Sequence, residues 1–233
     1  MIGFDRPIKP EWIYKAIKIS EPGKYLKTIF EQFNYIVSEL TGNEGKRKVR
    51  NVITRLFIID ESNKMKIAKN LVLKQLVDEK NIEFLKPLFL IMIIGKTQVL
   101  YKLSDLIIRL FKPNDVLNLE LLKKKIQDEY GERDISKRAV SSFLKTLEYF
   151  DFIFKVDNSY ILKDRINITE DQFCEMLKIF SKEILKTPQI DLNLPNALFG
   201  YFCDFDLVTI AKKYNGIYWD YHSLLKDSYL LFY

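Results

Sequence analysis

The sequence predicts a mainly α-helical protein, and three observations support this fold class. Apolar residues recur three and four positions apart along most of the 233 residues, as they do on the buried face of a helix. Prolines and glycines fall between these periodic stretches and divide them into separate helices. A short run of aromatic and β-branched residues, from 152 to 162, has the pattern of a β-hairpin.

We expect three parts in chain order. Hydrophobic residues make up 48% of the chain, which is enough for a sizeable core. The parts are an N-terminal helical bundle over residues 1–98, a helix-turn-helix with a hairpin over residues 99–163, and a C-terminal helical, aromatic-rich segment over residues 164–233.

The N-terminal part is expected to pack amphipathic helices around one apolar helix. Pro10 is well placed at an early position of the first helix, which a Pro-Gly pair ends. The spacing of apolar residues predicts a second helix from Leu26 to Leu40 and a lysine-rich helix from Ile67 to Val77. Residues 84–94 are apolar on almost every side, so we expect them to form the central buried helix.

A basic helix is expected between Thr41 and Asp60. Thr41 and Glu44 have the spacing of a capping box, in which each side chain binds a free amide of the first turn. Cations at a helix N-terminus oppose the helix dipole, but together with free amides they offer an anion site. A solvated basic face is the alternative interpretation. The cations are Lys46, Arg47, Lys48, Arg50 and Arg55.

Three helices are expected in the middle part, with a tight turn before the third. The first runs from Leu100 to Phe111 and the second from Leu119 to Tyr130, after which Gly131 ends it. Ser136 is a good N-cap for the third helix. One face of that helix is apolar and carries Ala139, Val140, Phe143, Leu144, Leu147 and Phe150.

A β-hairpin follows the third helix. Phe152 to Val156 and Tyr160 to Leu162 are strand-like runs on either side of a polar turn, and Val116-Leu117 fits a short first strand. Helix, tight turn, helix and hairpin occur in this order in a winged helix-turn-helix. In that fold the second helix of the motif lies in the DNA major groove, and the hairpin is the wing.

The polar face of the third helix holds the candidate DNA-contacting residues. Long cationic side chains reach phosphates or guanine edges, and short hydroxyl side chains let the backbone approach a groove. A plain packing or partner-binding module is the alternative, because Glu148 lies close by and winged helices also bind proteins. The candidates are Lys137, Arg138, Ser141, Ser142 and Lys145 on the helix and Lys155 in the wing.

The two basic helices share a local pattern. Each has a Lys-Arg pair, a valine two residues later and apolar residues at matching offsets, so that Lys46-Arg47 corresponds to Lys137-Arg138. Any amphipathic helix with a basic start has a similar pattern, so chance is one explanation. The other is that the chain presents two helices of one design to one long anion.

The composition is compatible with a polyanionic partner without requiring one, and it gives no sign of catalytic chemistry. The net charge is +6 and the pI is about 9.0. With one histidine, His222, the chain has no His-based triad and no multi-His metal site, and it has no glycine-rich nucleotide loop. We therefore expect a protein that is not an enzyme, with no metal and no cofactor, and with double-stranded DNA as its partner.

Cysteine usage and apolar runs favour a cytoplasmic protein. Cys174 and Cys203 do not form a CxxC motif, as expected in a reducing compartment. The first residues lack the apolar core of a signal sequence. The longest apolar run, Leu88 to Ile94, is far below the ~20 residues that a membrane span needs, so we expect no membrane partner. The oligomeric state stays open.

The C-terminal part is expected to begin with a well-capped helix. Thr169 and Gln172 have capping-box spacing ahead of a helix that ends before Pro188. Residues 187–202 contain two prolines and a glycine, which predict an irregular segment. The residues beyond are rich in Tyr, Phe and Leu, which indicates packing onto the rest of the protein, with a partner surface as the alternative.

The order of these motifs resembles the BrxA proteins of BREX-type bacteriophage-defence systems. The resemblance covers residues 40–162: the basic helix from Lys46-Arg47 to Arg55-Leu56, the apolar helix and its successor from Leu88 to Phe111, and the Ser-Lys-Arg helix before the wing, Ser136 to Ile153. It implies a small, mostly helical protein that binds DNA through winged-helix-like parts, alongside other defence proteins. A free-standing winged-helix transcription regulator and an adaptor of a larger defence complex are the alternatives.

Overall fold

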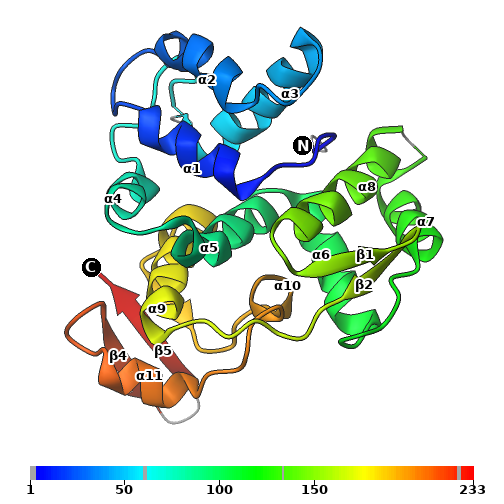
Figure 1. Cartoon of the computed structure of the whole chain (residues 1–233). Coiled ribbons are helices and arrows are strands. Elements are labelled where there is room, and N and C mark those ends of the chain that lie inside the picture. The colour runs from blue at the N-terminus through cyan, green and yellow to red at the C-terminus, as the bar shows by residue number, and fades with distance from the viewer. Residues whose placement is uncertain (1–3, 60–61, 133, 225–226) are drawn as a thin grey trace.

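The computed structural model describes residues 4–59, 62–132, 134–224 and 227–233. It is mainly helical, as predicted, with small antiparallel sheets (Figure 1). The buried side chains form one continuous hydrophobic cluster that draws on the N-terminal, middle and C-terminal parts of the chain.

The N-terminal elements are shorter than the apolar periodicity predicts. The expected helix over residues 26–40 is a 3₁₀ turn followed by a short α-helix. The helix expected from Ile67 starts later, because Ile67 donates its N–H to Lys24 and pairs with Ile59 in extended conformation. The elements are α1 (Pro10–Ile19), η1 (Leu26–Ile29), α2 (Phe30–Ile36), α3 (Asn43–Ile53), the π-helix η2 (Thr54–Ile58) and α4 (Val72–Glu79).

Helix α5 (Ile82–Gly95) is the central helix, as predicted. Asn81 caps it by accepting a hydrogen bond from the Phe84 amide at 3.0 Å, and residues 87–94 are all buried. It contacts α1, α4, α6 and α9, and Figure 1 shows it at the centre of the fold. Among the described residues no single helix is long and apolar enough to cross a membrane; α5 and α6 (Gln98–Leu110) reach that length only as a pair bent by 113°.

The middle part contains the predicted order of helices and strands. It consists of α6, α7 (Leu119–Tyr130), α8 (Asp134–Tyr149), β1 (Ile153–Val156) and β2 (Ser159–Leu162). Gly131 ends α7 with φ near +84°, a value at which a glycine avoids Cβ strain. Strands β1 and β2 pair antiparallel, and Val116 adds a bridge to Ile161, where the short first strand was expected.

Ser136 does not cap α8. The helix begins two residues earlier, at Asp134, so Ser136 lies inside its first turn and is fully buried. Its hydroxyl has no hydrogen-bond partner among the described residues.

The C-terminal part differs from the helical segment that the sequence predicts. The Thr169–Gln172 capping box is present, but the later residues form a three-stranded antiparallel sheet in the order β3-β5-β4. Buried Trp219 fixes this sheet by donating a hydrogen bond from Nε1 to the Ala211 carbonyl at 3.0 Å. The elements are α9 (Glu170–Ile179), the π-helix η3 (Phe180–Leu185), β3 (Gln189–Asp191), α10 (Asn196–Phe199), α11 (Leu207–Lys213), β4 (Trp219–Leu224) and β5 (Asp227–Phe232).

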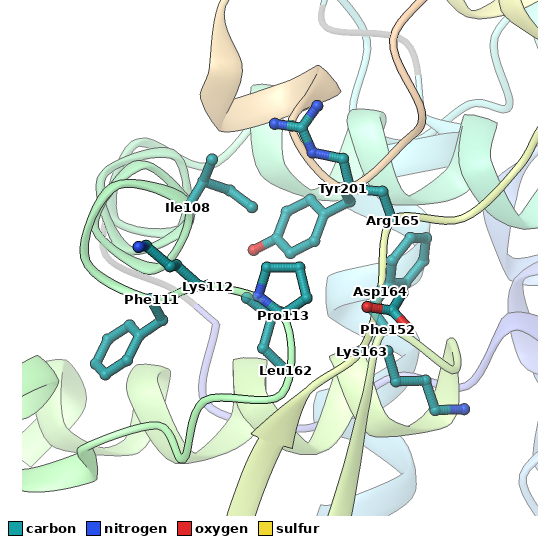
Figure 2. Close-up of a pocket in the computed structure, with 11 residues that line it drawn as sticks. Ile108, Phe111, Lys112, Pro113, Phe152, Leu162, Lys163, Asp164, Arg165 and Tyr201 are labelled. Atoms are coloured by element: carbon teal, nitrogen blue, oxygen red, sulfur yellow. The ribbon is translucent and has the colours of Figure 1, made fainter.

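Tyr201 joins the C-terminal part to the middle part. Figure 2 shows its ring between Ile108 of α6 and Phe152, beside a cavity of about 170 Å³. The Tyr201 and Phe152 rings meet edge to face, with their centroids 5.4 Å apart. Gly200 permits the close approach of this segment to α6, since a Cβ at that position would lie 2.7 Å from the Ile108 side chain. The segment expected to be irregular, residues 187–202, contains a short strand and a short helix, β3 and α10.

Candidate nucleic-acid interface

Helix α8 separates an apolar face from an exposed polar face. The six residues predicted to form the apolar face are all buried. Five of them lie in α8, and Phe150 follows its last residue. Lys137, Arg138 and Ser141 are exposed on the other side, as the 3.6-residue period predicts. The charged end of this face lies in the first half of the helix.

An extended N-terminal segment, residues 4–9, packs along α8. The Ile8 amide donates a hydrogen bond to Thr146 Oγ1 at 3.0 Å, and Thr146 Oγ1 donates to the Ser142 carbonyl at 2.8 Å. Ser142 is 7% exposed, so it does not belong to the exposed face on which the sequence places it. The N-terminal segment lies more than 130 residues away from α8 in the chain, so helical periodicity alone does not reveal this packing.

The N-terminal segment, α7 and α8 line an open basic hollow, which we call the α8 hollow. Its volume is about 420 Å³. The Nε of Arg6 is buried beside it with no hydrogen-bond partner among the described residues. The hollow is lined by Asp5, Arg6, Lys123, Lys137, Arg138, Ser141 and Ser142. Cations outnumber the single acid among these residues, so the hollow can receive an anion.

Arg6 and Lys123 are members of the hollow that the sequence analysis missed. Lys123 lies on α7 and pairs with Glu120 at 2.8 Å. The only local sign in the sequence is the run of three lysines that starts at Lys123. Arg6 lies in an irregular segment, and no local pattern marks it.

Lys145 is held within α8. Its Nζ donates to both carboxylate oxygens of Glu148 at 2.8 Å and lies 5.0 Å from the centre of the Tyr149 ring. The hydrogen bond to Glu148 raises the pKa of Lys145. The structure therefore places this lysine in an internal ion pair and outside the α8 hollow.

The hairpin carries the remaining candidate, Lys155. Lys155 is exposed on β1, with its Nζ 5.9 Å from the centre of the Tyr160 ring on β2. An exposed apolar row lies beside it: Val156 is 46% exposed, Phe154 37% and Val116 56%, and the last two flank Ile161. The hairpin surface is thus more apolar than basic.

The basic residues of α3 are partly neutralised by acids. Glu44 accepts two hydrogen bonds from Arg47, both at 2.8 Å, and this contact lowers the pKa of Glu44. Lys48 lies 3.7 Å from Glu44 and 3.6 Å from Asp5. Lys46 is half-buried at the same end of the helix.

Arg50 packs against an aromatic ring. Its guanidinium lies 3.9 Å from the centre of the Phe30 ring, and its Nε is buried without a hydrogen-bond partner among the described residues. Burial lowers the pKa of Arg50, and repulsion from Arg47 lowers it further. A cation in this position would gain from a nearby anion.

The predicted capping box of α3 is absent. The helix begins at Asn43, after Gly42 with φ near +86°, so Thr41 lies outside it and Glu44 binds Arg47 instead. No side chain of the described residues caps the first turn. Amides at the start of α3 therefore have no side-chain acceptor there and point toward the basic end of the helix.

Arg55 is separated from the other α3 cations. It lies on η2, is half-buried, and lines a second cavity together with residues of η3. Burial lowers its pKa, and the Asp5 carboxylate opposes this effect.

The N-terminal segment lies between the two basic helices. Asp5 pairs with Lys48 of α3, and together with Arg6 it lines the hollow in front of Lys137 and Arg138. Figure 1 shows α3 and α8 on opposite sides of this segment. The segment thus contacts α3 through Asp5 and lines the α8 hollow through Asp5 and Arg6.

Other chemistry is sparse in the described part of the chain. No group of three or more His, Cys, Asp or Glu residues there is placed to hold a metal ion. Cys174 and Cys203 are both free thiols, and burial raises the pKa of Cys174 to about 12. Comparisons with protein-family models, with curated proteins and with solved structures gave no match.

Proposed function

We propose that this protein binds double-stranded DNA and does not catalyse a reaction on it. In this proposal α6, α7, α8 and the hairpin act as a winged helix-turn-helix. Helix α8 enters the major groove with its N-terminal half, and the hairpin is the wing. The observation that carries the proposal is the α8 hollow, because four cations from three elements converge there beside exposed Ser141.

The α3 helix extends the proposed contact along the DNA backbone. Its uncapped first turn and its Lys46, Arg47 and Arg50 side chains suit phosphate oxygens. Arg6 lines the α8 hollow next to Asp5, which pairs with Lys48 of α3, and would bind a phosphate beside α8. Phosphate contacts of this kind fix the position on the duplex, whereas α8 would read base edges.

The biological setting proposed for this binding is phage defence. It rests on the resemblance of residues 40–162 to BrxA proteins, and it makes other proteins of a defence system the expected partners. A transcription regulator with the same DNA-binding surface remains the alternative setting.

A protein-interaction adaptor is a second candidate function. The apolar row of Val116, Phe154 and Val156 favours it, since exposed apolar patches commonly mark partner surfaces. A wing that touched only phosphates would be more basic. The adaptor function would use the apolar row of Val116, Phe154 and Val156, whereas DNA binding would use the α8 hollow.

Salt dependence tests the proposed function. Duplex binding followed by fluorescence anisotropy should weaken steeply as salt rises, with log K falling by about 0.9 per contacted phosphate for each log unit of salt. If Lys46, Arg47 and Arg50 of α3, Lys137 and Arg138 of α8, and Arg6 each contact one phosphate, a slope of about −5 is expected, at about 0.9 per phosphate. No duplex binding at low salt would reject the proposal in favour of the adaptor.

A further inference from the structure

A second basic cavity lies between the two π-helices. Its volume is about 430 Å³, within the range of about 300–1,000 Å³ that small-molecule sites occupy. Residues Arg55 and Phe57 of η2 form one side, and Lys182 and Glu183 of η3 form another. These two π-helices are far apart in the sequence, and π-helical turns are often found at functional sites.

Lys186 also lines this cavity. It is the C-terminal cap of η3 and has φ near +55°, a left-handed conformation in which many helices end.

Lys96 ties the two π-helices together. Its Nζ donates to the Leu56 carbonyl of η2 at 3.1 Å and pairs with the Glu183 carboxylate of η3. This pair is the only place where the described lining residues include a carboxylate. Around it stand Arg55, Lys69, Lys182 and Lys186, so cations outnumber acids.

The remaining walls combine apolar side chains with a helix start. Helix α4 begins at the cavity, its N-cap position is Leu71, and no side chain of the described residues caps its first turn. Leucine is a poor N-cap, so the first amides of α4 have no side-chain acceptor there. Ile59, Leu71 and Val72 keep part of their apolar surface exposed beside these amides.

We infer that this cavity binds a small phosphate-bearing molecule with an apolar part, of the nucleotide class. Lys69 and Lys182 hold the phosphates together with the α4 amides, because charge-assisted contacts from ammonium groups and from a helix N-terminus suit phosphate oxygens. The apolar part lies against Ile59, Leu71 and Val72. Lys96 and Glu183 position the two π-helices and do not contact the ligand. This inference does not depend on DNA binding.

Isothermal titration calorimetry with ATP and with tripolyphosphate tests the inference. The variant Lys69→Ala/Lys182→Ala removes two exposed cations of the cavity. Lys15→Ala/Lys27→Ala removes two exposed lysines elsewhere and is the matched control. We expect ATP to bind the wild type at least tenfold more tightly than tripolyphosphate, and its affinity to fall at least tenfold in the cavity variant but less than twofold in the control.

A second variant tests the site from the opposite direction. Leu71→Asp supplies a capping carboxylate to α4 and places a negative charge in the cavity, so ATP binding should be abolished while the protein stays folded. Three results would overturn the inference: no ATP binding by the wild type at millimolar concentration, equal binding by the cavity variant and its control, or displacement of ATP by a short DNA duplex that the cavity variant no longer binds.

Discussion

The buried hydroxyl of Ser136 is a small destabilising feature of α8. A buried hydroxyl without a hydrogen-bond partner costs about 1–3 kcal/mol of desolvation, and alanine is the better helix former. Ser136→Ala should therefore raise the free energy of unfolding by about 1 kcal/mol in urea titrations. If Ser136 capped the helix, the same change would lower it by about 1 kcal/mol. Ser141→Ala, on the exposed face of the same helix, is the control and should change stability by under ~0.5 kcal/mol.

Glu175 gives a pH-dependent prediction. It is buried in α9, and burial raises its pKa above 4.5 although Lys178 at 3.5 Å acts in the opposite direction. A raised carboxyl pKa means that the folded protein binds a proton more tightly than the unfolded chain, so stability falls as pH rises through the window above 4.5. In urea titrations, the free energy of unfolding of Glu175→Gln relative to that of the wild type should be higher at pH 7 than at pH 4. A difference that does not change with pH would contradict this reasoning.

At the scale of elements, the sequence was most informative where one helix buries one face. The bounds of α7, the all-round burial of α5 and the apolar face of α8 follow from periodicity. Periodicity failed where backbone pairing competes with it, as at Ile67, and where aromatic residues of β4 and β5 alternate too briefly to be distinguished from a helix. Periodicity also could not place Ser142 and Arg6 correctly. Arg6 belongs to the N-terminal segment, and that segment packs against α8 from a distant part of the chain.

The α3 helix gives two predictions of opposite sign. Lys46→Ala/Arg47→Ala should weaken duplex binding and reduce the salt slope by about 0.9 for each phosphate that the variant no longer binds. Glu44→Gln should strengthen binding, because the Glu44 carboxylate holds Arg47 and Lys48 and repels phosphates. Arg50 is not replaced in this variant, because its guanidinium packs on the Phe30 ring and its removal would also change that contact.

Duplex length separates the two explanations of the α3 cations. If α3 and α8 bind one duplex, Lys46→Ala/Arg47→Ala should weaken binding more on long duplexes than on ones too short to reach both helices. The effect should also be similar for every DNA sequence, because phosphates carry no base identity. A solvated face predicts that neither slope nor length dependence changes.

At the scale of the whole molecule, the N-terminal segment makes one surface of two distant helices. It contacts α3 through Asp5, donates a hydrogen bond from the Ile8 amide to Thr146 of α8, and contributes Arg6 to the α8 hollow. Neither basic helix alone shows this arrangement in its sequence. The proposed DNA-binding surface therefore depends on the tertiary fold as much as on the two Lys-Arg motifs.

Anisotropy titration of Arg6→Ala/Arg138→Ala with duplex DNA tests this surface most directly. The two arginines come from different elements and both line the α8 hollow, and Lys15→Ala/Lys27→Ala provides a control with the same change of charge. We expect the hollow variant to melt at the wild-type temperature, to bind at least tenfold more weakly and to have a salt slope shallower by about 1.8, at about 0.9 per phosphate. Equal affinity and equal slope for the hollow variant and the control would contradict a DNA-binding role for α8.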